Sequence, residues 1–375
     1  MNIKISKKIL QNALSNVSRA ILPNSPVPAM QGILLSAYDS KLVLLASSSN
    51  ISIKIELSNT LNENCNLTIM QEGKILMDAR YLNEVVRKSD GETISLEIID
   101  GQLVKIFTDN TEYKINGLNP NDYPAIDFES KDSKAFKLNS LDFTKLVNST
   151  VFATSDSEVR PELTGLHLIF NHNSLKAVAT DSFRLSQNEI AIESDINLEV
   201  NVPKKALIEI TRIFAADEMV NVRLSQSMIQ FSNENILVQS RLIEGEYPKT
   251  DRLIPTNFVL TMDFDKRVLQ NSIDRSLFIK SEGINIVKLN YENDNLSIKS
   301  DSNEVGSSYQ DLPFLKADGK DLKIAFSGNY VEDALKVINA SKVSLNFSGE
   351  LTAFVIKNEK EPNEIHLILP YRVYD

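Results

Sequence analysis

The sequence contains a single cysteine, Cys65, among its 375 residues. One thiol excludes an internal disulfide framework and any metal site that needs several thiolates. Long apolar runs are also missing, because no stretch approaches the roughly 18–20 residues that cross a bilayer. The first eight residues lack the apolar segment of a signal peptide. We therefore expect a cytoplasmic protein with no membrane partner.

The usual catalytic and cofactor motifs are absent as well. There is no G-x-G-x-x-G, G-x-x-x-x-G-K-[ST], H-E-x-x-H or G-x-S-x-G. The 12 glycines are spread thinly, so no loop can turn several backbone N–H groups onto a phosphate. The histidines, His167, His172 and His366, form no ligand pair at i,i+4 spacing. We expect no catalytic residue, metal or cofactor; the alternative is a hydrolase whose carboxylates meet in an interdomain cleft.

What the sequence does contain is an internal repeat. Short strand-like segments open three parts of the chain, and each continues into a helical pattern with one apolar stripe. Strand-like runs that start at Gly32 and Leu42 recur at Gly165 and Leu175, with the same offset for both runs. Each part closes on an aromatic or leucine followed by proline: Tyr123-Pro124, Tyr247-Pro248 and Leu369-Pro370.

The repeat predicts an α+β fold of three tandem copies, each with two helices packed on antiparallel sheets. A copy of about 125 residues is an ordinary domain size. We expect domains at residues 1–127, 134–253 and 256–375. The polar residues between the first two copies are interpreted as a linker.

The formal charge of −10 argues against a conventional nucleic-acid binder. The charge is unevenly distributed, however. The six predicted helical windows together carry +9, so the other residues carry −19. Cations on helices can contact phosphates without reading bases, although they can also be ordinary solvated helix residues. The candidate DNA-facing residues are Lys8, Arg19, Arg80, Arg87, Lys88, Lys204, Lys205 and Arg212.

Three segments, residues 179–185, 242–255 and 369–373, complete the pattern. In this order, on a triplicated α+β framework, they resemble the bacterial DNA polymerase III β sliding clamp family along the whole chain. The resemblance implies a head-to-tail homodimeric ring that encircles duplex DNA without sequence preference. It also implies a non-enzymatic processivity factor for DNA replication.

The resemblance further implies a hydrophobic groove between the second and third domains. It would take short linear motifs from the replicative DNA polymerase, the clamp loader and repair proteins. By matching segments, the groove residues are Leu163, Thr180, Arg184, Leu185, Pro248, Arg252, Leu253, Tyr330, Leu351, Leu367, Leu369, Pro370, Tyr371 and Arg372. Arg184 and Arg252 favour this interpretation, because arginines are difficult to explain as core residues.

By the same resemblance, the dimer interface would pair Tyr113 and Ile115 of the first domain with Phe278 and Ile279 of the third.

The chain departs from the family pattern near the groove. Ser182-Phe183 stands where many members have Gly-His, so we expect a bulkier and less polar groove there. Tyr374 and Asp375 extend beyond the usual ending. The departure at Ser182-Phe183 keeps one alternative open, a clamp paralogue that serves repair or inhibitor resistance.

Overall fold

A computed structural model describes residues 1–129, 133–280 and 283–372 of the chain. The expected extension, Tyr374 and Asp375, lies outside the described residues, as do residues 130–132 of the expected first linker. Within the described part, no helix is long and apolar enough to span a membrane.

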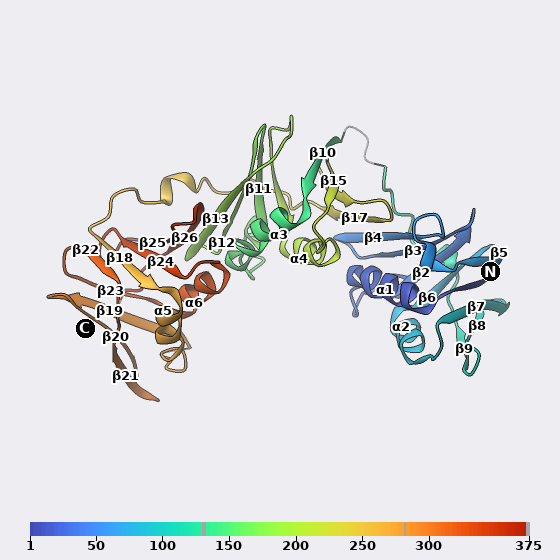
Figure 1. The fold of residues 1–375 in the computed structure, drawn as a ribbon, viewed down its shortest axis with the longest axis horizontal. Helices are drawn as coiled ribbons and strands as arrows, with labels where there is room; N and C mark the ends of the chain where they lie inside the picture. Colours follow the sequence, from blue (N-terminus) through green and yellow to red (C-terminus); the bar gives the residue numbers. More distant parts are fainter. Residues whose placement is uncertain (130–132, 281–282, 373–375) are drawn as a thin grey trace. The chain divides into compact units, whose positions relative to one another are not determined.

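The first repeat contains two helices that separate three groups of strands (Figure 1). Its elements are β1 (Asn2–Ser6), α1 (Lys7–Val17), β2 (Gly32–Tyr38), β3 (Lys41–Ser47), β4 (Ile51–Leu57), β5 (Thr68–Gln71), β6 (Gly73–Asp78), α2 (Ala79–Lys88), β7 (Thr93–Asp100), β8 (Leu103–Phe107) and β9 (Glu112–Asn116).

The second repeat has the same order of helices and strands without a counterpart of β5. Its elements are β10 (Lys134–Asn139), α3 (Ser140–Asn148), β11 (Gly165–Asn171), β12 (Ser174–Thr180), β13 (Arg184–Ala191), β14 (Leu198–Pro203), α4 (Lys204–Ile213), β15 (Met219–Leu224), β16 (Met228–Ser232) and β17 (Ile236–Arg241).

The third repeat has the full set again. Its elements are β18 (Leu260–Asp265), α5 (Lys266–Asp274), β19 (Ile286–Glu292), β20 (Asn295–Ser302), β21 (Gly306–Asp311), β22 (Lys316–Gly319), β23 (Leu322–Ser327), α6 (Gly328–Val337), β24 (Lys342–Phe347), β25 (Phe354–Asn358) and β26 (Glu361–Ile368). The predicted triplicated α+β fold is confirmed.

Helix α2 illustrates how local sequence determines these elements. Asp78 caps the helix, because its carboxylate accepts the backbone N–H groups of Arg80 and Tyr81. Apolar residues at helical spacing, including Leu82 and Val86, are fully buried. The helix contacts β2 and β6, while α1 contacts β3 and β4, so both cover the same sheet (Figure 1).

Two of the sheets run across repeat boundaries. The eight-stranded sheet has the order β10-β15-β16-β17-β4-β3-β2-β6, and the nine-stranded sheet has the order β14-β11-β12-β13-β26-β25-β24-β18-β22. The smaller sheets are β5-β1-β7-β8-β9 and β21-β20-β19-β23. We name the antiparallel pairing of β4 with β17 the first joint and that of β13 with β26 the second joint.

The joints determine how the chain divides into compact units. One unit holds Met1–Leu141 with Lys205–Leu242, and the other holds Asp142–Lys204 with the chain from Ile243 onward. Each unit contains one complete joint. Each compact unit therefore corresponds to one of the two large sheets. The domain boundaries expected from the sequence repeat stay predictions.

Candidate peptide-binding groove, DNA-facing helices and strand edges

The second joint has an apolar floor. Leu185 of β13 pairs with Leu367 of β26 in the ladder. These two leucines form one buried cluster with Leu163, Val178 and Tyr247, and none of the five is more than 6% exposed. The expected groove residues Leu163, Leu185 and Leu367 therefore contact a common core.

Exposed apolar side chains accompany this floor. Leu253, Leu351, Leu369 and Tyr371 are 56%, 67%, 41% and 40% exposed. Leu369 is held at the joint, because its backbone N–H donates to the carbonyl of Phe183 at 3.0 Å. Of the other expected residues, Arg252 and Arg372 are exposed, and Pro248, Tyr330 and Pro370 are half-buried.

Arg184 is held by a network of interactions at the second joint, and its place in a groove stays a prediction. Its Nε donates to Asp181 at 3.0 Å, its Nη1 to Asp333 at 2.7 Å and its Nη2 to the carbonyl of Phe152 at 3.0 Å. The guanidinium also lies over the ring of Tyr330, 4.5 Å from its centroid. These interactions occupy every guanidinium nitrogen, so Arg184 fixes the wall of the joint and is not a free cation for a ligand.

The turn between β12 and β13 is fixed by short-range hydrogen bonds. Thr180 Oγ1 donates to the carbonyl of Arg184 at 2.6 Å, and Asp181 Oδ1 accepts the backbone N–H of Phe183 at 2.9 Å. Ser182 has a left-handed backbone, with φ of 79°. This turn leaves the ring of Phe183 61% exposed beside Leu369.

Two residues behind the floor were not included in the expected site. Tyr247 supports the cluster, and His167 stacks on its ring at 4.5 Å with an interplanar angle of 3°. His167 Nδ1 also lies 2.8 Å from Asn201 Oδ1. Burial lowers the pKa of His167 and raises the pKa of Tyr247. The repeated Tyr-Pro closure was the sequence signal that could have identified Tyr247.

Several of the expected DNA-facing cations have acidic partners on the helices. Arg87 and Lys88 both contact Glu84, at 2.7 and 3.1 Å. Arg19 and Arg212 contact Glu209 at 2.8 and 3.0 Å. Such pairs reduce the net charge that these residues offer to phosphates.

The remaining expected cations are less constrained. Lys204 contacts Asp156 at 3.2 Å, but Asp156 is almost fully exposed. Lys8, Arg80 and Lys205 have no acidic partner within 4 Å among the described residues. The structure thus leaves a sparse set of available cations on the helices.

The expected dimer residues lie at two outer strands. Tyr113 and Ile115 are half-buried on β9, which lies at the edge of its sheet and pairs with β8. Phe278 is 67% exposed and follows α5, which is tied to the outer strand β21 through Arg275 and Gln310 at 3.0 Å. Ile279 is only 2% exposed, so it packs inside its own chain and does not offer its side chain at a surface.

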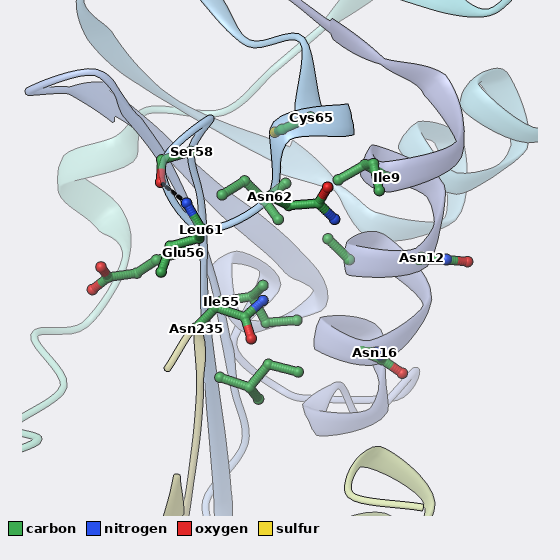
Figure 2. A pocket seen from close by; sticks show the side chains of 13 residues that line it. Ile9, Asn12, Asn16, Ile55, Glu56, Ser58, Leu61, Asn62, Cys65 and Asn235 are labelled. Carbon is green, nitrogen blue, oxygen red and sulfur yellow. Dashed lines mark hydrogen bonds between the residues drawn. The ribbon is translucent and has the colours of Figure 1, made fainter. Parts of the chain in front are cut away.

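A small cavity lies between α1 and β4, as Figure 2 shows. Its volume is about 140 Å³, and its lining includes Asn12, Asn62, Asn235 and Cys65. Cys65 is buried, and burial raises the pKa of its thiol. Among the described residues, no group of three or more His, Cys, Asp or Glu side chains could hold a metal ion.

The fold and the second joint define a class: a triplicated α+β protein whose sheets continue from one repeat to the next, with a buried apolar cluster beside the second joint. Comparison with known families agrees. Residues 1–127, 137–249 and 251–372 match the N-terminal, central and C-terminal domains of the DNA polymerase III beta subunit. The chain belongs to the DNA polymerase III beta subunit family.

Individual relatives match over the complete chain. Proteins named beta sliding clamp from Staphylococcus epidermidis and Staphylococcus aureus are 31% and 30% identical, with 100% of both chains covered. The DNA polymerase sliding clamp of Bacillus subtilis is 30% identical, with full coverage of both chains and a TM-score of 0.94. The DNA polymerase III beta chain of Streptococcus pneumoniae is 30% identical with a TM-score of 0.95, covering 99% of this chain and 100% of that one.

Proposed function

We propose that this protein is a DNA polymerase processivity factor that catalyses no reaction itself. Two copies would join head to tail into a ring around duplex DNA, and the ring would tether the replicative polymerase. Clamp-loader and repair proteins would share the same groove. The proposal rests on the full-length family match and on one structural observation, the unpaired ends of a repeating series of strand joints.

The series of joints is incomplete within one chain. β4 is the third strand after the first helix of its repeat, and it pairs with β17, the last strand of the second repeat. β13 has the same place in the second repeat and pairs with β26, the last strand of the third. Their counterparts β21 and β9 have no such partner among the residues that the structure describes, since each is the outermost strand of its sheet. Pairing β21 with β9 of a second copy repeats the joint and removes two open edges.

Residues beside the joints support the same pairing. Arg19 follows α1 and contacts Glu209 on α4 at the first joint. Its counterpart in the second repeat, Phe152, packs against the core of the third repeat. The corresponding position after α5 is Phe278, which is 67% exposed. We therefore place Phe278 against α2 of the partner, where Tyr81 is 51% exposed.

The dimer is tested with Phe278→Asp alone, because Ile279→Asp would place a charge inside the fold. We expect monomers at micromolar concentration by light scattering, whereas Val159→Asp, at an 88% exposed position of the second repeat, should stay dimeric. An undiminished dimer mass for Phe278→Asp would contradict the proposed interface.

The sparse cations of the helices suit a protein that slides. Encirclement retains the DNA topologically, so strong phosphate binding is unnecessary and would slow movement. The direct test is retention on nicked circular DNA after loading by a clamp loader. We expect the protein to stay on the circle and to leave when the same circle is cut once; equal loss from both would refute encirclement.

The groove is tested by fluorescence anisotropy with a labelled, leucine-rich polymerase peptide. Leu369→Asp should weaken binding at least tenfold, because an exposed apolar contact is replaced by a charge. Leu315→Asp is a matched control at a 55% exposed leucine outside the expected groove. Unchanged affinity of Leu369→Asp would exclude the second joint as the binding site.

A further inference from the structure

The first joint repeats the strand pairing of the second and borders a hollow. In the second joint, Leu369 N–H donates to the carbonyl of Phe183 at 3.0 Å; in the first, Arg241 N–H donates to the carbonyl of Asn50 at 2.9 Å. Asn50 and Phe183 are repeat counterparts, separated by the same offset as Gly32 and Gly165. The hollow beside Asn50 and Arg241 has a volume of about 370 Å³.

We propose that this hollow, the first-joint groove, is a second docking site that binds a short extended peptide with one acidic residue next to an apolar one. The proposal extends the proposed function, since it takes the second joint as a peptide site and its repeat counterpart as another. The occupant differs because the two linings differ.

The floor of the first-joint groove is polar where the other floor is apolar. Ser52 and Gln239 pair in the ladder, as Leu185 and Leu367 do in the second joint. Ser52 Oγ lies 2.7 Å from Ser47 Oγ, and Gln239 Nε2 donates to the carbonyl of Asp127 at 3.0 Å. These buried polar groups already have hydrogen-bond partners within the chain. The polar floor therefore does not favour the binding of a leucine-rich peptide.

The walls determine the chemistry of the occupant. Met30, Met228 and Ile126 line the groove and are half-buried, and methionine adapts readily to an apolar side chain. Arg241 stands at the place of Leu369, is exposed, and has no acidic partner within 4 Å among the described residues. A carboxylate of the peptide therefore pairs with Arg241 while its neighbour enters between the methionines.

Asp127 limits the number of acidic residues in the peptide. Asp127 lines the same groove, and its Oδ1 accepts the backbone N–H of Glu129 at 2.7 Å. A second carboxylate near Asp127 would be repelled. The groove therefore selects one acidic residue and disfavours an acidic run.

The two methionines provide a direct readout. The chain has 7 methionines, and none of the expected residues of the second-joint groove is a methionine. Methyl-¹³C-methionine NMR, assigned with Met30→Leu and Met228→Leu, therefore reports the first-joint groove separately. The probe is a capped hexapeptide with aspartate followed by leucine in a serine and glycine background.

We expect saturable shifts of both the Met30 and Met228 methyl signals. Asparagine in place of the peptide's aspartate should weaken binding about tenfold, through loss of one charge-assisted hydrogen bond. Arg241→Glu should weaken it at least as much. Arg223→Glu, at another exposed arginine of the same sheet, is the matched control and should leave the affinity unchanged.

Three results would overturn the proposal: no shift at millimolar peptide, equal affinity for the asparagine peptide, or full affinity of Arg241→Glu. Failure of the proposed function is recognised independently. In that case the polymerase peptide fails to bind the second-joint groove in the anisotropy experiment, whatever the methionine signals do.

Discussion

The two joints of this chain have nearly the same backbone and opposite linings. Each pairs the third strand of one repeat's hairpin group with the last strand of the next repeat. The second joint encloses a cluster of leucine, valine and tyrosine, whereas the first joint places Ser52 and Gln239 at the corresponding ladder positions. Main-chain hydrogen bonds thus maintain the architecture while the side chains diverge.

The joints also differ at the first residue of β13 and of β4. Arg184 joins Asp181, Asp333 and the carbonyl of Phe152 at the second joint. Its counterpart in the first repeat, Ile51, is 3% exposed and makes no such network. Besides apolar contacts, the second joint therefore has the charge network of Arg184, whereas the first joint has neutral amides and hydroxyls and the Arg19–Glu209 ion pair.

The largest loss of stability is expected when the second joint receives a floor residue of the first joint. Leu367→Gln removes a buried leucine and introduces an amide without the partners that Gln239 has. We expect a loss of about 3 kcal/mol in the free energy of unfolding. Urea unfolding should show it, with faster hydrogen exchange in β13 and β26.

The reverse change, Gln239→Leu, is the matched control in the first joint. It leaves the carbonyl of Asp127 without its donor and Gln230 Nε2 with only the carbonyl of Phe128 as acceptor, but it adds apolar area. We expect a loss of about 1 kcal/mol or less. Equal losses for both variants would show that the difference between the two linings does not affect the free energy of unfolding.

The charge network is the next largest difference. Arg184→Ile, which installs the residue of the first joint, should cost about 2 kcal/mol because it leaves Asp181 and Asp333 without their shared cation. Arg184→Lys should recover less than half, since one ammonium cannot reproduce three divergent donors. Thermal unfolding measures both; full recovery by lysine would mean that charge alone matters.

Much of this architecture was readable from the sequence, because a repeat makes strand order and register recur at a fixed offset. That offset already related Gly165 to Gly32, and both begin strands at the same place in their repeats. Local periodicity carries this information. The place of Leu185 and Leu367 in a groove was implied by the family resemblance alone and stays a prediction.

Contacts between residues far apart in the chain could not be predicted from the sequence. Arg184 was expected in the groove, but the sequence did not show that its guanidinium pairs with Asp333, 149 residues away. Ile279 was expected at a surface, but its side chain is only 2% exposed, and Asn285 Nδ2 donates to its carbonyl at 3.2 Å. No periodicity in a single chain reports such pairings.

A further difference between the joints concerns pH. His167 stacks behind the second floor, whereas its repeat counterpart is Leu34. Burial lowers the pKa of His167, so the unfolded chain binds a proton first as the pH falls below about 6.5. The native state should therefore lose stability as the pH decreases through that range.

His167→Leu should remove this component and make the second joint resemble the first. The measurement is the free energy of unfolding in urea at several pH values between about 5.5 and 7.5. His172→Leu, at an exposed histidine of the same region, is the control and should keep the wild-type slope. Identical slopes for wild type and His167→Leu would contradict a buried, neutral His167.

The smallest expected change in stability concerns the turn between β12 and β13 and its counterpart between β3 and β4. Ser182 has a φ of 79°, while Ser49, at the same place in the first joint, is not among the residues with positive φ. Glycine adopts the left-handed region without the steric cost that a Cβ carries, but elsewhere it adds freedom to the unfolded chain. Ser182→Gly should therefore raise the free energy of unfolding by about 0.5–1 kcal/mol, and Ser49→Gly should lower it by a similar amount. Opposite signs in thermal unfolding would show that the joints differ in backbone strain as well as in lining; the same sign in both variants would confine the difference to side chains.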